Sequence, residues 1–108
     1  MRRRKWPVAA FAKLNRAFRP GTVLRLTKLW PHARQHGYEH GQVLLVGAYC
    51  DCCGPNLIYL FTVEGELNTT GTRDFVRAHF AVVAPSNTRR WFTFPEPWPP
   101  ASVRTRVA

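Results

Sequence analysis

GTVLRLT at residues 21–27, QVLLVGAY at 42–49, LIYLFTV at 57–63 and FAVVA at 80–84 are the runs that decide the fold. Each run is short, apolar and rich in β-branched or aromatic residues, and Gly, Pro, Asn and Asp residues separate the runs. Short apolar runs bounded by turn residues are typical of β-strands. The stretch 21–84 therefore predicts a small all-β barrel, and the segments outside it are basic, Pro-rich or both.

The chain is one domain by its length of 108 residues, and its charge is distributed unevenly. Sixteen Lys and Arg face six Asp and Glu, which gives a formal net charge of +10. Seven of the sixteen cations lie in residues 1–20, which contain no acid. A basic arm of this kind commonly meets phosphate, an anionic membrane or an acidic protein. Arg outnumbers Lys 13 to 3, which fits phosphate binding and equally fits the codon usage of a GC-rich genome.

The three Cys are an odd number, so a complete disulfide framework is excluded. We therefore expect a reduced, cytoplasmic setting, or a virion if the protein is phage-encoded. No apolar run approaches the ~20 residues of a membrane span, so no span is predicted. The apolar part of the N-terminus is too short for a secretory signal, whereas an Arg-rich targeting peptide stays open as an alternative.

The sequence of the N-terminal arm, residues 1–20, indicates a cluster of cations followed by a basic helix. Alanines favour the helix, and Phe11, Leu14 and Phe18 share one of its faces. The narrow apolar stripe favours a helix that caps the barrel, and the alternative is an amphipathic helix that docks on a partner or a membrane.

The runs and the segments between them predict a definite order of elements. A long loop at 28–41 follows the first strand, a turn at 51–56 follows the second, and a tight hairpin at Glu64 and Gly65 follows the third. A short fourth strand at 67–70 leads through one helical turn near 75–77 into the strand at 80–84.

This order resembles the SH3-like small barrel, and the resemblance covers residues 21–84. It implies five short strands, with 89–94 as a possible sixth. Peptide-binding SH3 domains carry an acidic long loop and an Ala-Leu-Tyr-Asp-Tyr signature, whereas the long loop here holds three His, Lys28, Arg34 and one acid, Glu39. Binding of Pro-rich ligands is therefore not implied. The opening run GTVLRL is closer to the basic SH3-like barrels of ribosomal and transcription factors.

Three segments follow from this interpretation: a basic arm or helix at 1–20, the barrel at 21–94 and a Pro-rich basic tail at 95–108. Closely spaced prolines predict that the tail is extended. The tail either wraps its own barrel or enters a groove on a partner.

A zinc site is one hypothesis for the Cys-rich turn. Three thiols and one imidazole, that of His32, His36, His40 or His79, would make the Cys₃His set that zinc accepts. The predicted ligands are Cys50, Cys52, Cys53 and His40. The close spacing of the thiols opposes a zinc site, because all three lie within four residues and zinc sites usually use two separated pairs of Cys. The alternative is a turn with free or buried thiols. His32, His36 and His40 recur every four residues, but Pro31 and the loop glycines oppose a continuous helix that would align them.

No catalytic residues are predicted, because the acids are scattered and no nucleophile, phosphate-loop or dinucleotide motif occurs. We therefore expect a binding module rather than an enzyme.

Cations and aromatic residues alternate in four segments, 4–6, 28–32, 34–38 and 89–91. This pattern favours nucleic acid, since Arg and Lys bind phosphate while aromatic rings stack on bases. The predicted contact residues for a nucleic acid or nucleoprotein are Arg2, Arg3, Arg4, Lys5, Trp6, Lys28, Trp30, His32, Arg34, His36, Tyr38, Arg89, Arg90 and Trp91. The aromatic residues among them are alternatively core residues. A second hypothesis is a phage-encoded protein-binding factor, either a structural component of the virion or an inhibitor of a host defence or transcription protein. A third is a zinc-stabilised interaction module.

Overall fold

A five-stranded antiparallel sheet forms the centre of the computed structural model, which describes residues 6–94. Its strands are β1 (Val23–Leu26), β2 (Val43–Val46), β4 (Ile58–Phe61), β5 (Leu67–Gly71) and β6 (Phe80–Ala84), in the spatial order β5-β4-β2-β1-β6. The prediction of a small β-rich domain is confirmed, and the five strands lie at the predicted runs. The predictions for residues 1–5 and 95–108 lie outside the described residues.

The main core lies on one face of this sheet, because side chains alternate between its two faces. Leu24 and Leu26 of β1 are fully buried in the core, whereas Arg25 between them is exposed. The same core contains residues from outside the sheet, namely Phe11, Phe18, Tyr49, Val76 and Trp91. The opposite face carries a smaller apolar cluster around Val23 and Leu45.

The N-terminal segment forms two short helices instead of the single helix expected up to Pro20. They are α1 (Val8–Leu14) and the 3₁₀ turn η1 (Arg16–Phe18), and Asn15 separates them with φ −124° and ψ 40°. Phe11 and Phe18 are buried, as a capping segment requires, but Leu14 is 42% exposed and does not join them.

Asn15 explains why the helix is interrupted. Its side chain is buried and donates a hydrogen bond to the Pro55 carbonyl oxygen (2.7 Å). The Arg73 guanidinium donates to the Asn15 side-chain oxygen (3.2 Å) and to the same Pro55 oxygen (3.3 Å). Because a buried amide must find partners, these bonds fix the N-terminal segment to the turn at 51–56 and to the helix that begins at Arg73.

A second, two-stranded sheet pairs β3 (Tyr49–Cys50) in parallel with β7 (Thr93–Phe94). The predicted second strand at 42–50 is therefore interrupted, and only two residues of the possible strand at 89–94 are in a strand. The Tyr49 hydroxyl donates to the Phe18 carbonyl oxygen (2.7 Å), so β3 also holds η1 in place.

The helix before β6 is longer than the predicted single turn. This helix, α2 (Arg73–His79), begins after Thr72, whose hydroxyl accepts the Phe75 amide hydrogen bond. Thr72 as N-cap and Asp74 in the first turn are favourable starting residues, which explains the extra length.

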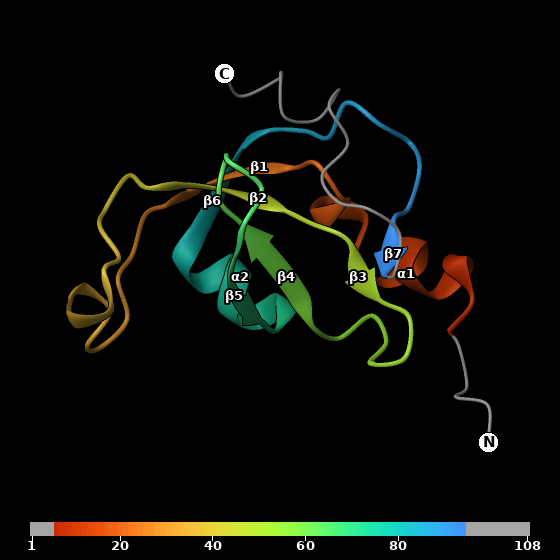
Figure 1. Cartoon of the computed structure of the whole chain (residues 1–108), viewed down its shortest axis with the longest axis horizontal. Helices are drawn as coiled ribbons and strands as arrows, with labels where there is room; N and C mark the ends of the chain where they lie inside the picture. Colours follow the sequence, from red (N-terminus) through yellow and green to blue (C-terminus); the bar gives the residue numbers. More distant parts are fainter. Residues whose placement is uncertain (1–5, 95–108) are drawn as a thin grey trace.

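The β1–β2 loop and the N-terminal helix lie at opposite ends of the molecule (Figure 1). The loop extends from one end of the sheet, while α1, β3 and β7 lie together at the other end. Within residues 6–94, no helix is long and apolar enough to cross a membrane.

Candidate functional site

The long β1–β2 loop is fixed at its base by His79 at the end of α2. The His79 carbonyl oxygen accepts hydrogen bonds from the amides of Thr27 (2.9 Å) and Lys28 (3.2 Å). In return, the Nδ1 atom of His79 hydrogen-bonds the Lys28 carbonyl oxygen at 2.6 Å. At the other side of the base, the Gly41 amide donates to the Leu26 carbonyl oxygen (2.7 Å). The loop thus starts and ends at defined points on the fold.

Trp30 attaches the middle of the loop to the domain through aromatic contacts. Its ring centroid lies 4.8 Å from that of Tyr38 and 4.9 Å from that of Phe75 on α2. Its centroid is 5.4 Å from the His79 imidazole. Trp30 and Tyr38 are half-buried and pack against the core, so they serve first to hold the loop and only their exposed edges are available to a ligand.

The tip of the loop is a compact turn rather than an open chain. It contains the 3₁₀ turn η2 (Arg34–His36), and the Tyr38 amide closes it by donating to the Ala33 carbonyl oxygen (3.1 Å). His32 enters it with φ 66°, a left-handed conformation that non-glycine residues adopt at a cost of about 1–3 kcal/mol. The turn leaves the side chains of His32, Arg34 and His36 exposed.

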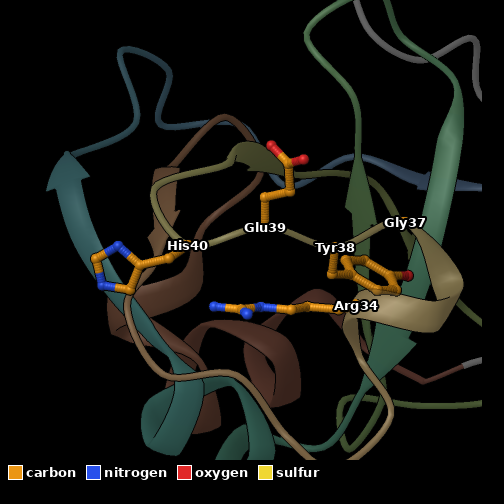
Figure 2. A pocket seen from close by; sticks show the side chains of 5 residues that line it. All are labelled: Arg34, Gly37, Tyr38, Glu39 and His40. Atoms are coloured by element: carbon orange, nitrogen blue, oxygen red, sulfur yellow. The ribbon is translucent and has the colours of Figure 1, made fainter.

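A hollow of about 400 Å³ lies beside this turn and is lined by Arg34, Gly37, Tyr38, Glu39 and His40. Figure 2 shows the Arg34 guanidinium extended toward the His40 imidazole, while the Glu39 carboxylate points away from both. The hollow therefore offers two nitrogen-bearing groups and one aromatic edge.

A second basic region forms where the N-terminal segment meets residues 86–92. The Arg19 guanidinium donates to the Thr88 carbonyl oxygen (3.3 Å), and the Ser86 hydroxyl donates to the Pro20 carbonyl oxygen (2.5 Å). These contacts bring together cations that are distant in sequence. We call this region the basic end and define it as Arg16, Arg19, Arg89 and Arg90, of which all except the half-buried Arg19 are exposed.

Trp91 belongs to the core and not to a surface that could stack on bases. It is only 8% exposed, its ring lies 5.7 Å from that of Tyr49, and the Arg19 guanidinium covers it at 5.3 Å. The prediction that Trp91 contacts a ligand together with Arg89 and Arg90 is therefore corrected. The two arginines are at the surface, whereas the tryptophan is structural.

Trp6 rests on the Cys-rich turn, close to where the basic arm begins. Its amide donates to the Asp51 carbonyl oxygen (3.0 Å), and its indole lies over Gly54. A Cβ atom added to Gly54 would come within 2.7 Å of that indole. The side chain is still 44% exposed, so Trp6 combines a fixed position with an accessible ring.

The predicted contact residues therefore form two groups instead of one face. Lys28, Trp30, His32, Arg34, His36 and Tyr38 belong to the long loop. Trp6 is bound to the Cys-rich turn at the opposite end of the sheet, where α1, β3 and β7 lie (Figure 1). Arg89 and Arg90 belong to the segment between Thr88 and β7. Two contributors were missed by sequence reasoning, because no local pattern shows that His79 anchors the loop or that Arg19 reaches Thr88.

The three thiols do not assemble with His40 as metal ligands. Among the residues that the structure describes, no group of three His, Cys, Asp or Glu side chains could hold a metal ion. His40 lies in the long loop, at the far end of the sheet from the Cys-rich turn (Figure 1). The prediction of a zinc site is therefore wrong for the set Cys50, Cys52, Cys53 and His40. The three thiols are neighbours in sequence, but the fold places the His40 imidazole far from them.

No protein family model matches this sequence, and neither a curated protein nor a solved structure matches it.

The position of Trp6 on the turn can be tested with a pair of glycine variants. Gly54 and Gly41 share φ +89°, so Gly54→Ala and Gly41→Ala carry the same backbone strain, about 1–2 kcal/mol. Only at Gly54 does the new methyl group meet the indole. We expect urea denaturation to show that Gly54→Ala is destabilised by about 1 kcal/mol more than Gly41→Ala. Adding Trp6→Ala should remove that difference, and its persistence would show that the indole is not the obstacle.

Proposed function

We propose that this protein is a small basic SH3-like module that binds nucleic acid or a nucleoprotein through phosphate contacts. The strand order and the return of β6 to β1 support the SH3-like part of the proposal. Further support comes from the long loop after β1 and the short connection between β4 and β5. The absence of a clustered catalytic set in the sequence favours binding over catalysis.

The observation that carries the binding proposal is the contact between Arg19 and Thr88. It joins the N-terminal segment, with Arg16 and Arg19, to the segment that carries Arg89 and Arg90. The cluster of cations at residues 2–5 precedes Trp6, whose backbone is bound to the turn at this same end of the sheet. A concentration of positive charge is the electrostatic footprint of a phosphate-binding surface.

The long loop supplies a second set of contacts in this proposal. Lys28 and Arg34 are exposed cations on a loop whose base and middle are fixed, so little ordering entropy would be lost when they bind. Because the loop and the basic end lie at opposite ends of the sheet, a strand of nucleic acid must cross the domain to reach both. Two separated contacts on one strand raise its affinity by effective concentration.

Two variants with equal charge loss test the basic end. Arg16→Ala with Arg89→Ala removes two exposed cations there, and Arg25→Glu lowers the net charge by the same two units on the exposed face of β1. Fluorescence anisotropy on single-stranded RNA and DNA, measured across salt concentrations, gives the slope of log K against log salt. We expect the double variant to reduce that slope by about 1.4–1.8 and Arg25→Glu to change it little. Equal effects of the two variants would mean that only net charge matters, which contradicts a defined site.

The edge strand β6 favours a second candidate function, the binding of another protein. Val82 and Val83 are each 50% exposed, and an apolar edge strand offers unpaired backbone groups to a strand of another chain. Capture from a host lysate with and without nuclease separates the two candidates. Association that survives nuclease and is lost in Val82→Lys, but not in the Arg16 and Arg89 variant, supports the protein partner.

A further inference from the structure

The Cys-rich turn holds two of its thiols in a defined relation. The Cys50 carbonyl oxygen accepts from the Gly54 amide (3.1 Å), and the Cys50 sulfur accepts from the Cys53 amide (3.3 Å). The second bond places the Cys50 sulfur against the backbone of Cys53. A disulfide joins residues whose Cα atoms are about 4.4–6.8 Å apart, and a chain that turns back within four residues brings Cys50 and Cys53 into this range.

We propose that Cys50 and Cys53 are a redox-active dithiol that forms a reversible disulfide with low-molecular-weight disulfides as the oxidant. This site is independent of nucleic-acid binding. All three cysteines are free in the structure, and Cys53 is exposed while Cys50 is half-buried.

The surroundings of the turn make Cys50 the attacking thiol. Burial opposes ionisation of Cys50, but hydrogen bonds from the Cys53 side chain and from the backbone of Cys53 and Cys52 lower its pKa overall, against the nearby charge of Asp51. The thiolate is the nucleophilic form of cysteine. The hydrogen bond with Cys50 raises the pKa of Cys53, although a hydrogen bond from Tyr59 acts in the opposite direction.

Tyr59 and Cys52 interact differently with the Cys50–Cys53 pair. Burial and the hydrogen bond to Cys53 raise the pKa of Tyr59 to about 12, so its phenol stays protonated and can donate to the Cys53 sulfur. The Cys52 thiol instead donates to the Asp51 carboxylate (3.4 Å). Cys52 is therefore the bystander thiol, which makes it a matched control.

The disulfide forms in two successive displacement reactions at sulfur. The Cys50 thiolate attacks one sulfur of the small disulfide, the S–S bond breaks, and the departing thiolate takes a proton from water. Cys53 then loses its proton to water and attacks the Cys50 sulfur of the mixed disulfide, which releases the second small thiol. In sum, the protein loses two protons and two electrons, and the oxidant is reduced to two small thiols.

The test uses the full chain, equilibrated with mixtures of oxidised and reduced glutathione, blocked with N-ethylmaleimide and digested after denaturation. The two Asp residues of the chain are Asp51 and Asp74. Cleavage on the N-terminal side of Asp51 separates Cys50 from Cys52 and Cys53, so a bond from Cys50 keeps the two peptides joined until reductant is added. We expect joined peptides with one labelled thiol in the wild type, and joined peptides with none labelled in Cys52→Ser.

Separated peptides are expected in Cys53→Ser, in which the proposed pair is broken. Loss of the link in Cys52→Ser would overturn the proposal, because the bond would then be between Cys50 and Cys52. Disulfide-linked dimers as the main product would also overturn it.

The folded chain should form this disulfide more readily than the unfolded chain, because the turn holds the two thiols together. We expect half-oxidation at a ratio of oxidised to reduced glutathione at least about tenfold lower than for the same chain in guanidinium. Equal ratios would show that the folded turn contributes nothing.

Discussion

Replacing Phe11 with alanine is expected to lower the free energy of unfolding by about 3–5 kcal/mol, as for other fully buried aromatic residues. Phe11 is 0% exposed, and its ring packs edge-on against Tyr49 with centroids 5.4 Å apart. Removal of the ring would leave a cavity between α1 and β3 that neighbouring side chains fill only in part. Urea denaturation, followed by fluorescence, measures the change.

Leu14→Ala is the matched control on the same helix. Leu14 is 42% exposed, so its truncation should cost less than about 1 kcal/mol. If both variants change the free energy of unfolding only slightly, helix α1 does not pack into the core, and residues 6–20 are not part of the folded unit. A large effect of Phe11→Ala alone would establish that the N-terminal segment is part of the folded unit.

Changing Arg2, Arg3, Arg4 and Lys5 together to serine is expected to produce the largest loss of nucleic-acid binding. Each cation that binds a phosphate contributes about 0.7–0.9 to the slope of log K against log salt, so four of them contribute about 3. The slope and the affinity at low salt should fall together in anisotropy titrations.

A lysine version of the arm, with Arg2, Arg3 and Arg4 each replaced by Lys, separates charge from guanidinium geometry. We expect it to keep the wild-type salt slope, because the number of charges is unchanged. An unchanged slope in the serine version would mean that the arm does not contact phosphate. The proposal would then depend on the basic end and the long loop alone.

The strands could be predicted from the sequence because their signals are local. FAVVA at 80–84 lies at the residues of β6, and LIYLFTV at 57–63 contains β4, since turn residues bound both runs. Helix α2 is longer than the single turn expected near 75–77, because the Thr72 side chain caps its first turn; this capping residue is a local signal that the sequence contains.

Features that depend on distant contacts could not be predicted. The interruption of the N-terminal helix at Asn15 arises from a hydrogen bond to Pro55, forty positions away. Trp91 next to two arginines has the same local pattern as a base-stacking residue, and only its contact with Tyr49 shows that it is buried. The division of the predicted contact residues into two ends likewise depends on tertiary structure.

The salt dependence of wild-type binding is the decisive measurement for the proposed phosphate-binding function. Nuclease-treated, nucleic-acid-free protein is titrated against a labelled single-stranded oligonucleotide between about 50 and 200 mM salt. Binding through the arm, the basic end and the loop predicts measurable affinity at low salt and a linear, steep fall of log K with log salt. No binding at the lowest salt, or an affinity that does not change with salt, would contradict the proposed phosphate-binding function.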